Sequence, residues 1–80
     1  MMAAGIMAAA VDVRDMTCAQ ALAQAGRAVK SLDVGQAVDI LCNAPDVKDD
    51  LLIWARELGH VVPAVKARGE EWAVTVQKGR

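Results

Sequence analysis

The 80-residue sequence has few aromatic residues, few cysteines and no excess of one charge. It contains two tryptophans and no Tyr or Phe, so it offers no row of stacking platforms for single-stranded bases. The net charge is -1, and the broad positive field that attracts nucleic acid is therefore missing. A nucleic-acid-binding α/β domain would fit the predicted architecture below but not this charge. Two cysteines are too few for a disulfide-rich secreted scaffold, and we expect a reducing compartment, the cytoplasm.

The rest of the composition is that of one small folded domain. Apolar residues make up 55% and charged residues 24% of the chain, which is a globular balance. A chain of this length supports one core, so we expect a single domain over residues 1–80. The apolar run at residues 1–10 lacks a basic n-region and is shorter than a membrane span. We therefore expect no membrane association and interpret residues 1–8 as a frayed lead into the first strand.

Hydrophobic periodicity predicts four strands and two helices. The predicted strands are residues 11–14, 37–42, 60–65 and 71–77, and the predicted helices are residues 18–31 and 45–58. The order is βαβαββ. A right-handed crossover makes the first two strands parallel and places both helices on one face of the sheet. The predicted class is thus α/β, a two-layer sandwich with a four-stranded mixed sheet.

Several expectations concern packing inside these elements. Pro63 removes a backbone donor, so its strand is expected at a sheet edge or at a bulge. Gly26 inside a helix costs about 1 kcal/mol relative to Ala, and we expect a close packing contact as its compensation. The predicted buried stripes are Leu22, Ala25, Val29 and Leu32 in the first helix and Val47, Leu51, Trp54, Ala55 and Leu58 in the second, with Lys48, Arg56 and Glu57 facing water.

Cys18 is the candidate reactive group because it stands at the start of the first predicted helix. Helix starts collect unpaired N–H groups and the positive end of the macrodipole, which stabilise a thiolate. The thiolate is the nucleophile toward a sulfur donor, and the same feature would stabilise a persulfide anion. From spacing alone, an inert thiol that packs as a small hydrophobe remains the alternative.

The residues around Cys18 carry a resemblance to a known family. The run Asp12-Val13-Arg14-Asp15-Met16-Thr17-Cys18 resembles the opening signature of the TusA/SirA-like sulfurtransferases, which read Asp-x-Arg-Gly-Leu-x-Cys-Pro-x-Pro. Further matches without gaps are residues 28–32, Gly35, residues 38–42, Pro45, Asp50, Trp54, Ala55 and the Gly59-His60 pair, so the resemblance covers most of the chain.

This resemblance implies both a fold and a function. The fold would be the same βαβαββ sandwich. Cys18 would accept persulfide sulfur from a protein donor, a cysteine desulfurase or a rhodanese-like protein, and relay it to a protein acceptor, DsrE-like or similar. The transfer would need no cofactor.

Three residues depart from the family signature. Ala19 and Ala21 stand where prolines are usual, which makes the helix start less rigid and adds an N–H group. Asp15 stands where glycine is usual and is expected to raise the pKa of Cys18, unless Arg14 reaches the site and offsets it. These changes leave a second hypothesis open, a non-catalytic binding or regulatory module on the same scaffold.

A carrier docks its donor and its acceptor around its thiol, so the surface beside Cys18 is the candidate contact for partner proteins. The residues that we assign to this contact are Arg14, Asp15, Gln20 and Arg27.

The other chemical groups are given structural roles. Cys42 shares a face with apolar strand residues and is interpreted as a buried structural thiol, although a redox pair with Cys18 stays conceivable if their Cα atoms lie within about 7 Å. His60 follows a glycine that ends a helix, where an imidazole can bond the last carbonyls, and we expect no metal site. The helix dipole accounts for Asp46, Asp49 and Asp50, and core packing accounts for Trp54 and Trp72.

Overall fold

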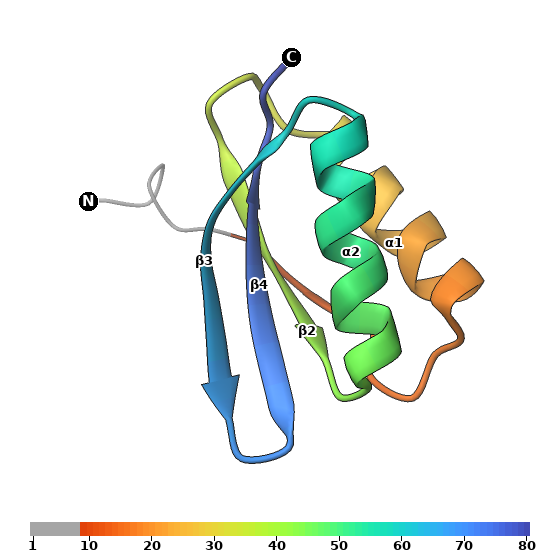
Figure 1. Ribbon diagram of the computed structural model, residues 1–80. Helices are drawn as coiled ribbons and strands as arrows, with labels where there is room; N and C mark the ends of the chain where they lie inside the picture. Colours follow the sequence, from red (N-terminus) through yellow and green to blue (C-terminus); the bar gives the residue numbers. More distant parts are fainter. Residues whose placement is uncertain (1–8) are drawn as a thin grey trace.

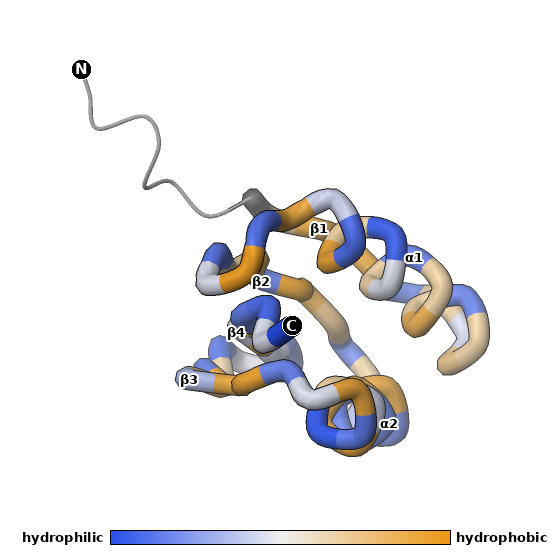
Figure 2. The backbone as a smooth tube through the Cα atoms, turned by 90° about the horizontal axis from the view of Figure 1, so that it is seen from above, coloured by the Kyte–Doolittle hydropathy of each residue, from blue (hydrophilic) through white to orange (hydrophobic). Residues whose placement is uncertain are grey.

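The computed structural model describes residues 9–80, in which two helices pack on one face of a four-stranded sheet (Figures 1 and 2). In chain order the elements are β1 (Ala9–Asp12), α1 (Cys18–Lys30), β2 (Ala37–Cys42), α2 (Pro45–Glu57), β3 (Val61–Arg68) and β4 (Glu71–Gln77). The predicted α/β class and βαβαββ order are confirmed. The segment expected to be frayed, residues 1–8, lies outside the described residues. No helix within residues 9–80 is long and apolar enough to cross a bilayer.

The strand order in the sheet is β1-β2-β4-β3, so β1 and β3 form its edges. β1 pairs with β2 in parallel, with Val11 opposite Ile40, while β4 pairs antiparallel with both β2 and β3. Since β1 and β2 are parallel, the loops that follow them leave the sheet at the same edge. The starts of α1 and α2 are therefore brought to one end of the molecule, at the bottom of Figure 1.

The core lies between the helices and the covered face of the sheet. In β2 the side chains alternate between buried and half-buried, and Val38, Ile40 and Cys42 have no exposed surface. The fully or almost fully buried residues of the other elements are Val13, Ala21, Ala25, Val29, Val47, Leu51, Ala55, Val74 and Val76. Alanines on the buried stripe of α1 leave room for the backbone of this helix to approach the sheet closely.

Pro63 lies in an edge strand and also in a bulge, as its missing donor requires. Val61 is opposite Gln77 and Ala64 is opposite Thr75, so between these pairs β3 has two residues where β4 has one. The extra residue interrupts the ladder next to Pro63. Both alternatives offered by the sequence are thus confirmed together.

Helix α2 ends in a Schellman motif built on Gly59. Gly59 has a φ of 82°, and the N–H groups of Gly59 and His60 donate to the carbonyl oxygens of Arg56 (3.1 Å) and Ala55 (2.9 Å). The motif turns the chain away before the apolar stripe is complete. Leu58, predicted to be buried, is consequently 48% exposed, and that prediction was wrong.

Other predictions of which helix residues are buried also differ from the structure. Ala21 takes the buried place next to Ala25, while Leu22 and Leu32 pack only partly against the core. Lys48, predicted to face water, is half-buried, and its ammonium lies 5.1 Å from the ring centroid of Trp72, a cation–π contact.

The expected packing contact of Gly26 is absent. A Cβ at this position would meet no heavy atom within 4 Å. The glycine therefore borders open space, and its helix-propensity cost has no packing compensation.

Candidate functional site

Cys18 is the first residue of α1, and its neighbours form a complete capping box. The N–H of Gln20 donates to Thr17 Oγ1 (3.2 Å), and the N–H of Thr17 donates to Gln20 Oε1 (3.0 Å). The box satisfies two of the N–H groups that a helix start leaves unpaired. The N–H groups of Cys18 and Ala19 belong to the same turn and have no intrahelical acceptor, so they point their positive ends out of the helix start.

The departures at Ala19 and Ala21 have different structural consequences. Ala19 is exposed, and its N–H is one that proline would not have supplied. Ala21 is fully buried, and its N–H donates to the carbonyl oxygen of Thr17 (2.9 Å). Proline at the latter position would remove this bond. The alanine sequence therefore keeps a regular hydrogen-bonded first turn around the thiol.

The Cys18 side chain is partly exposed, while its inner side packs against the core together with Met16. Partial exposure is the condition for exchange with another protein's sulfur, because a sealed thiol cannot be attacked or discharged. Cys42, by contrast, is fully buried, and burial raises the pKa of its thiol. Its predicted place as a structural thiol beside Val38 and Ile40 is confirmed.

Carboxylates at the start of α2 control the ionisation of Cys18. The pKa of the Cys18 thiol is raised above its ordinary value, and the largest cause is its interaction with the Asp50 carboxylate. Partial desolvation and the negative charges of Asp50 and Asp46 add to this increase. The direction agrees with the expectation from the sequence, but the residues responsible are different.

Asp15 does not act on the thiol, so the cause predicted from the sequence was wrong. Its N–H donates to Asn43 Oδ1 (3.0 Å), and Asn43 Nδ2 donates back to Asp15 Oδ1 (2.8 Å). Asp15 also has a φ of 62° and is the one non-glycine residue with positive φ among residues 9–80. Glycine suits this backbone conformation best, and Asp tolerates it better than most residues. Asn43 holds this turn by accepting from the backbone N–H of Asp15 and donating to its carboxylate.

Arg14 is also held away from the thiol. Its guanidinium donates to both carboxylate oxygens of Asp12, through Nε (2.9 Å) and Nη2 (2.7 Å), and to Glu71 through Nη1 (3.2 Å). These contacts lower the pKa of Asp12 to about 2 and raise that of Arg14. Arg14 thus ties the end of β1 to the start of β4, and the offset that it was to give Cys18 does not occur.

The four residues assigned to partner contact are therefore dispersed. Arg14 and Asp15 flank the loop before the thiol, and the Gln20 side chain is engaged in the capping box. Arg27 lies in the last turn of α1, and its nine-residue separation from Cys18 is roughly 14 Å along the helix axis. A contact centred on the thiol would reach the starts of both helices before it reached Arg27.

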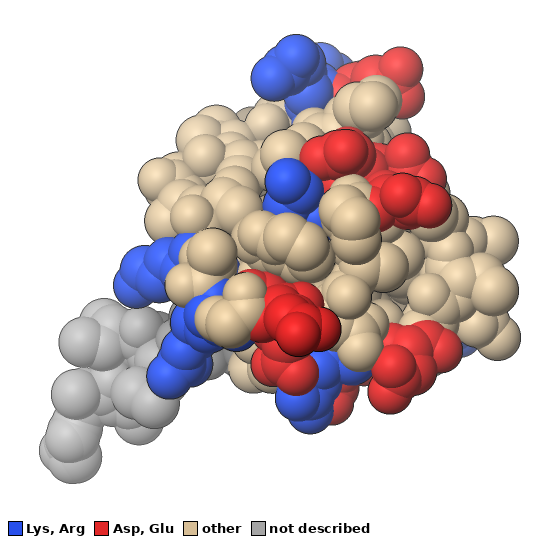
Figure 3. All heavy atoms as spheres, turned by 60° about the horizontal axis from the view of Figure 1, so that its bottom comes forward, with Lys and Arg blue, Asp and Glu red and all other residues tan. Residues whose placement is uncertain are grey.

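The acidic residues of α2 are the part of the site that sequence reasoning missed. From the sequence, the helix dipole alone accounts for these aspartates. Their proximity to Cys18 arises because the parallel pairing of β1 and β2 brings the starts of the two helices together. Figure 3 turns this side of the molecule toward the viewer and shows several groups of Asp and Glu on it. The predicted topology could have indicated this proximity, because loops that follow parallel neighbouring strands meet at one edge of the sheet.

The remaining candidate groups have structural surroundings. The imidazole of His60 accepts at Nδ1 from the N–H of Gly79 (3.1 Å) and lies 6.0 Å from the Trp54 ring, rather than capping the helix carbonyls as expected. Trp54 and Trp72 pack partly against the core, as predicted. Within residues 9–80, no three His, Cys, Asp or Glu side chains gather as a metal would require.

Comparison with known proteins agrees with this geometry. The family model described as "Sulfurtransferase TusA" matches residues 9–78, which span all six elements. A protein of Archaeoglobus fulgidus described as "Putative sulfur carrier protein" is 28% identical over 68 residues, covering 85% of this chain and 93% of that relative. With a match over nearly the whole described chain and the same order of strands and helices, this protein belongs to the TusA sulfurtransferase family.

Proposed function

We propose that this protein is a sulfur carrier that accepts persulfide sulfur on Cys18 from a donor protein and relays it to an acceptor protein. The observation that carries the proposal is the position of Cys18, partly exposed at the first residue of a capped helix in a TusA-family chain. The donor would be a cysteine desulfurase or a rhodanese-like protein, and the acceptor would be DsrE-like or similar. A free thiol requires a reducing compartment, and we place the reaction in the cytoplasm.

The transfer step balances without an added oxidant or reductant. The Cys18 thiolate attacks the terminal sulfur of the donor's persulfide, and a new sulfur–sulfur bond forms at Cys18. The bond between the donor's two sulfurs breaks, and the donor cysteine leaves as a thiolate. Discharge is the same reaction in the opposite sense, with the acceptor thiolate attacking the terminal sulfur and Cys18 as the leaving group.

The carboxylates beside the thiol affect the pKa of Cys18 and therefore its reactivity in this step. Because the interaction with the Asp50 carboxylate, partial desolvation and the negative charge of Asp46 raise the pKa of Cys18, they favour the protonated thiol in the idle carrier. A thiol is a much weaker nucleophile than a thiolate. Cationic groups of a docked partner would neutralise the carboxylates and lower the pKa of Cys18. Reaction with the donor would then depend on docking, and unspecific oxidation of the free carrier would be slow.

The test is loading by a cysteine desulfurase with free cysteine, read by intact mass after removal of the donor. We expect one added sulfur on the wild-type protein and on Cys42→Ser, and none on Cys18→Ser. The Cys42→Ser variant is the matched control, since it removes the buried thiol and leaves the exposed one. Absence of added sulfur with both a desulfurase and a rhodanese-like donor would overturn the proposal.

A second function, a binding or regulatory module without sulfur transfer, is favoured by one observation. The raised pKa of Cys18 works against the reactive thiolate. In that case partner binding would be indifferent to the thiol, and Cys18→Ala would retain its partners while the wild-type protein failed to load. Loss of partner binding on the same substitution would exclude this function.

A further inference from the structure

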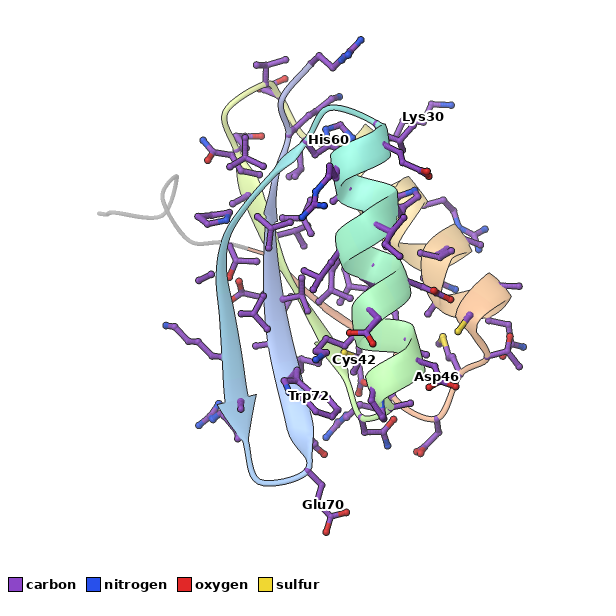
Figure 4. All side chains as sticks on the ribbon, in the orientation of Figure 1. Lys30, Cys42, Asp46, His60, Glu70 and Trp72 are labelled. Atoms are coloured by element: carbon purple, nitrogen blue, oxygen red, sulfur yellow. The ribbon has the colours of Figure 1, made fainter. Side chains whose placement is uncertain are left out.

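The end of the molecule opposite the thiol carries a cleft of about 310 Å³ between the ends of the two helices. Its apolar lining includes Val29 of α1 together with Trp54 and Leu58 of the α2 end. Figure 4 shows Lys30 and His60 at this end, far from Asp46 at the start of α2. The cleft is therefore separate from the site described above. Its volume is at the lower limit of pockets that take small molecules.

The charged residues that line the cleft are all cationic. They are Lys30, Lys78 and Arg80, and the lining contains no Asp or Glu although the whole chain has a net charge of -1. Within residues 9–80, the ion pairs join Arg14 to Asp12 and Glu71, and Lys48 to Asp49. None of them neutralises a cation of the cleft. The cleft is thus a local positive region on a slightly acidic protein, and it favours anions.

The three cations do not have the same role. Lys78 Nζ donates to the carbonyl oxygens of Leu32 (2.8 Å) and Lys30 (3.3 Å), so it is engaged in capping the end of α1. The Lys30 ammonium and the Arg80 guanidinium are left for a ligand. His60 accepts at Nδ1 from Gly79, which places the proton of the neutral imidazole on Nε2 and makes that atom a further donor.

Gly26 supplies an independent observation, because it is a helix-interior glycine that borders the cleft and has no packing reason. A Cβ there would meet no heavy atom within 4 Å, and Gly26 has no positive φ to explain a glycine. Its cost of about 1 kcal/mol relative to Ala is therefore uncompensated inside the folded chain. What the glycine does provide is space on the α1 side of the cleft.

We propose that this cleft binds a small organic anion with a planar apolar body, whose acidic group is held by Lys30 and Arg80 and whose body contacts Trp54. The apolar lining and the tryptophan ring match an aromatic or otherwise flat body. The unpaired cations match a carboxylate, sulfonate or phosphate. Binding here does not involve Cys18, so this proposal can be tested independently of sulfur transfer.

The test uses 1-naphthoate as the probe, with its neutral analogue naphthalene-1-methanol and inorganic sulfate as comparison ligands. Amide chemical shifts of the full chain would be followed during each titration. We expect 1-naphthoate to shift the amides of Gly26, His60 and Lys78. The neutral analogue should bind about tenfold more weakly, the equivalent of one charge-assisted contact. Sulfate alone should bind weakly, because it has no apolar body.

Two leucine substitutions on α1 form a matched pair. Gly26→Leu places a side chain in the cleft and should lower the affinity for 1-naphthoate by at least about tenfold, since the ligand's space is occupied. Ala23→Leu, on the exposed part of the same helix, should bind the probe like the wild-type protein. Lys30→Gln is the second test of the site, because an exposed residue is changed without filling the cleft.

Four results would overturn the proposal. One is unchanged affinity in both Gly26→Leu and Lys30→Gln. Another is a set of probe-induced shifts centred on Cys18 or on the uncovered face of the sheet. The third is equal binding of the charged and neutral probes. If an acidic peptide shifted the same amides while 1-naphthoate did not, the cleft would be a protein-docking surface and the small-anion proposal would be wrong.

Discussion

Replacing Gly26 by Ala should stabilise the protein, and the structure gives the size of the effect. The residue is inside α1, where glycine is about 1 kcal/mol less favourable than alanine because its backbone loses more freedom on folding. The added methyl group meets nothing within 4 Å, so no clash is subtracted. We therefore expect the free energy of unfolding to rise by about 0.5–1 kcal/mol. For a domain of this size, that corresponds to a melting temperature about 2–8 °C higher.

The assay is urea unfolding followed by far-UV circular dichroism, with the thermal melt as a second measurement. The urea midpoint should rise while the slope of the transition stays constant, since the surface exposed on unfolding is nearly the same. Gly79→Ala is the contrasting control, because a Cβ there would overlap the carbonyl oxygen of Gly59 and should destabilise the fold. A Gly26→Ala variant that is less stable than wild type would contradict this prediction, because it would mean that a side chain at this position is not tolerated.

Substitutions at three further positions test the site around the thiol. Asp50→Asn removes a charge and a carboxylate acceptor, so the pKa of Cys18 should fall and its alkylation by iodoacetamide at pH 7 should become faster; a profile of rate against pH that stays in place would contradict this. Asp15→Ala should destabilise by about 1–2 kcal/mol in urea, because it keeps the positive φ and loses the hydrogen bond from Asn43 Nδ2, whereas Asp15→Gly should cost clearly less. Thr17→Ala should cost about 1 kcal/mol by removing the helix cap, and a neutral effect would show that the capping box is not formed.

Local signals were sufficient to predict most of the fold. The strand at Ala37–Cys42 and the first residue of α2, Pro45, were predicted at their observed positions. Period-two alternation, proline at a helix start and glycine at a helix end each act within a few residues. Where a signal depended on the end of a helical stripe, as at Leu58, the Schellman turn changed the outcome.

The electrostatics of the site could not be predicted in the same way. Sequence proximity suggested that Asp15 and Arg14 act on Cys18, but hydrogen bonds to Asn43 and Asp12 direct both side chains elsewhere. The residue that matters, Asp50, is 32 positions along the chain and approaches through the parallel pairing of two strands. Charge effects depend on distance in space, so the cause of the raised pKa needed tertiary structure.

Likewise, the sequence showed that Gly26 is unusual inside a helix, but it did not show the reason for a glycine there. A helix-interior glycine is compatible with a close helix contact or with open space, and both cost the helix the same amount. Only the coordinates distinguish the two, by the absence of any neighbour within 4 Å. The cleft beside it is formed by the ends of both helices together with Lys78 and Arg80, which no local pattern connects.

The central claim is that Cys18 both receives a sulfur atom and gives it up. The most direct measurement follows isotopically labelled sulfur from free cysteine, through the desulfurase, onto the carrier, and then onto a DsrE-like acceptor added after the donor has been removed. We expect the label to leave Cys18 as it appears on the acceptor, and Cys18→Ser to transfer none. Label that reaches the acceptor equally well with Cys18→Ser, or that stays on the wild-type carrier, would contradict this claim.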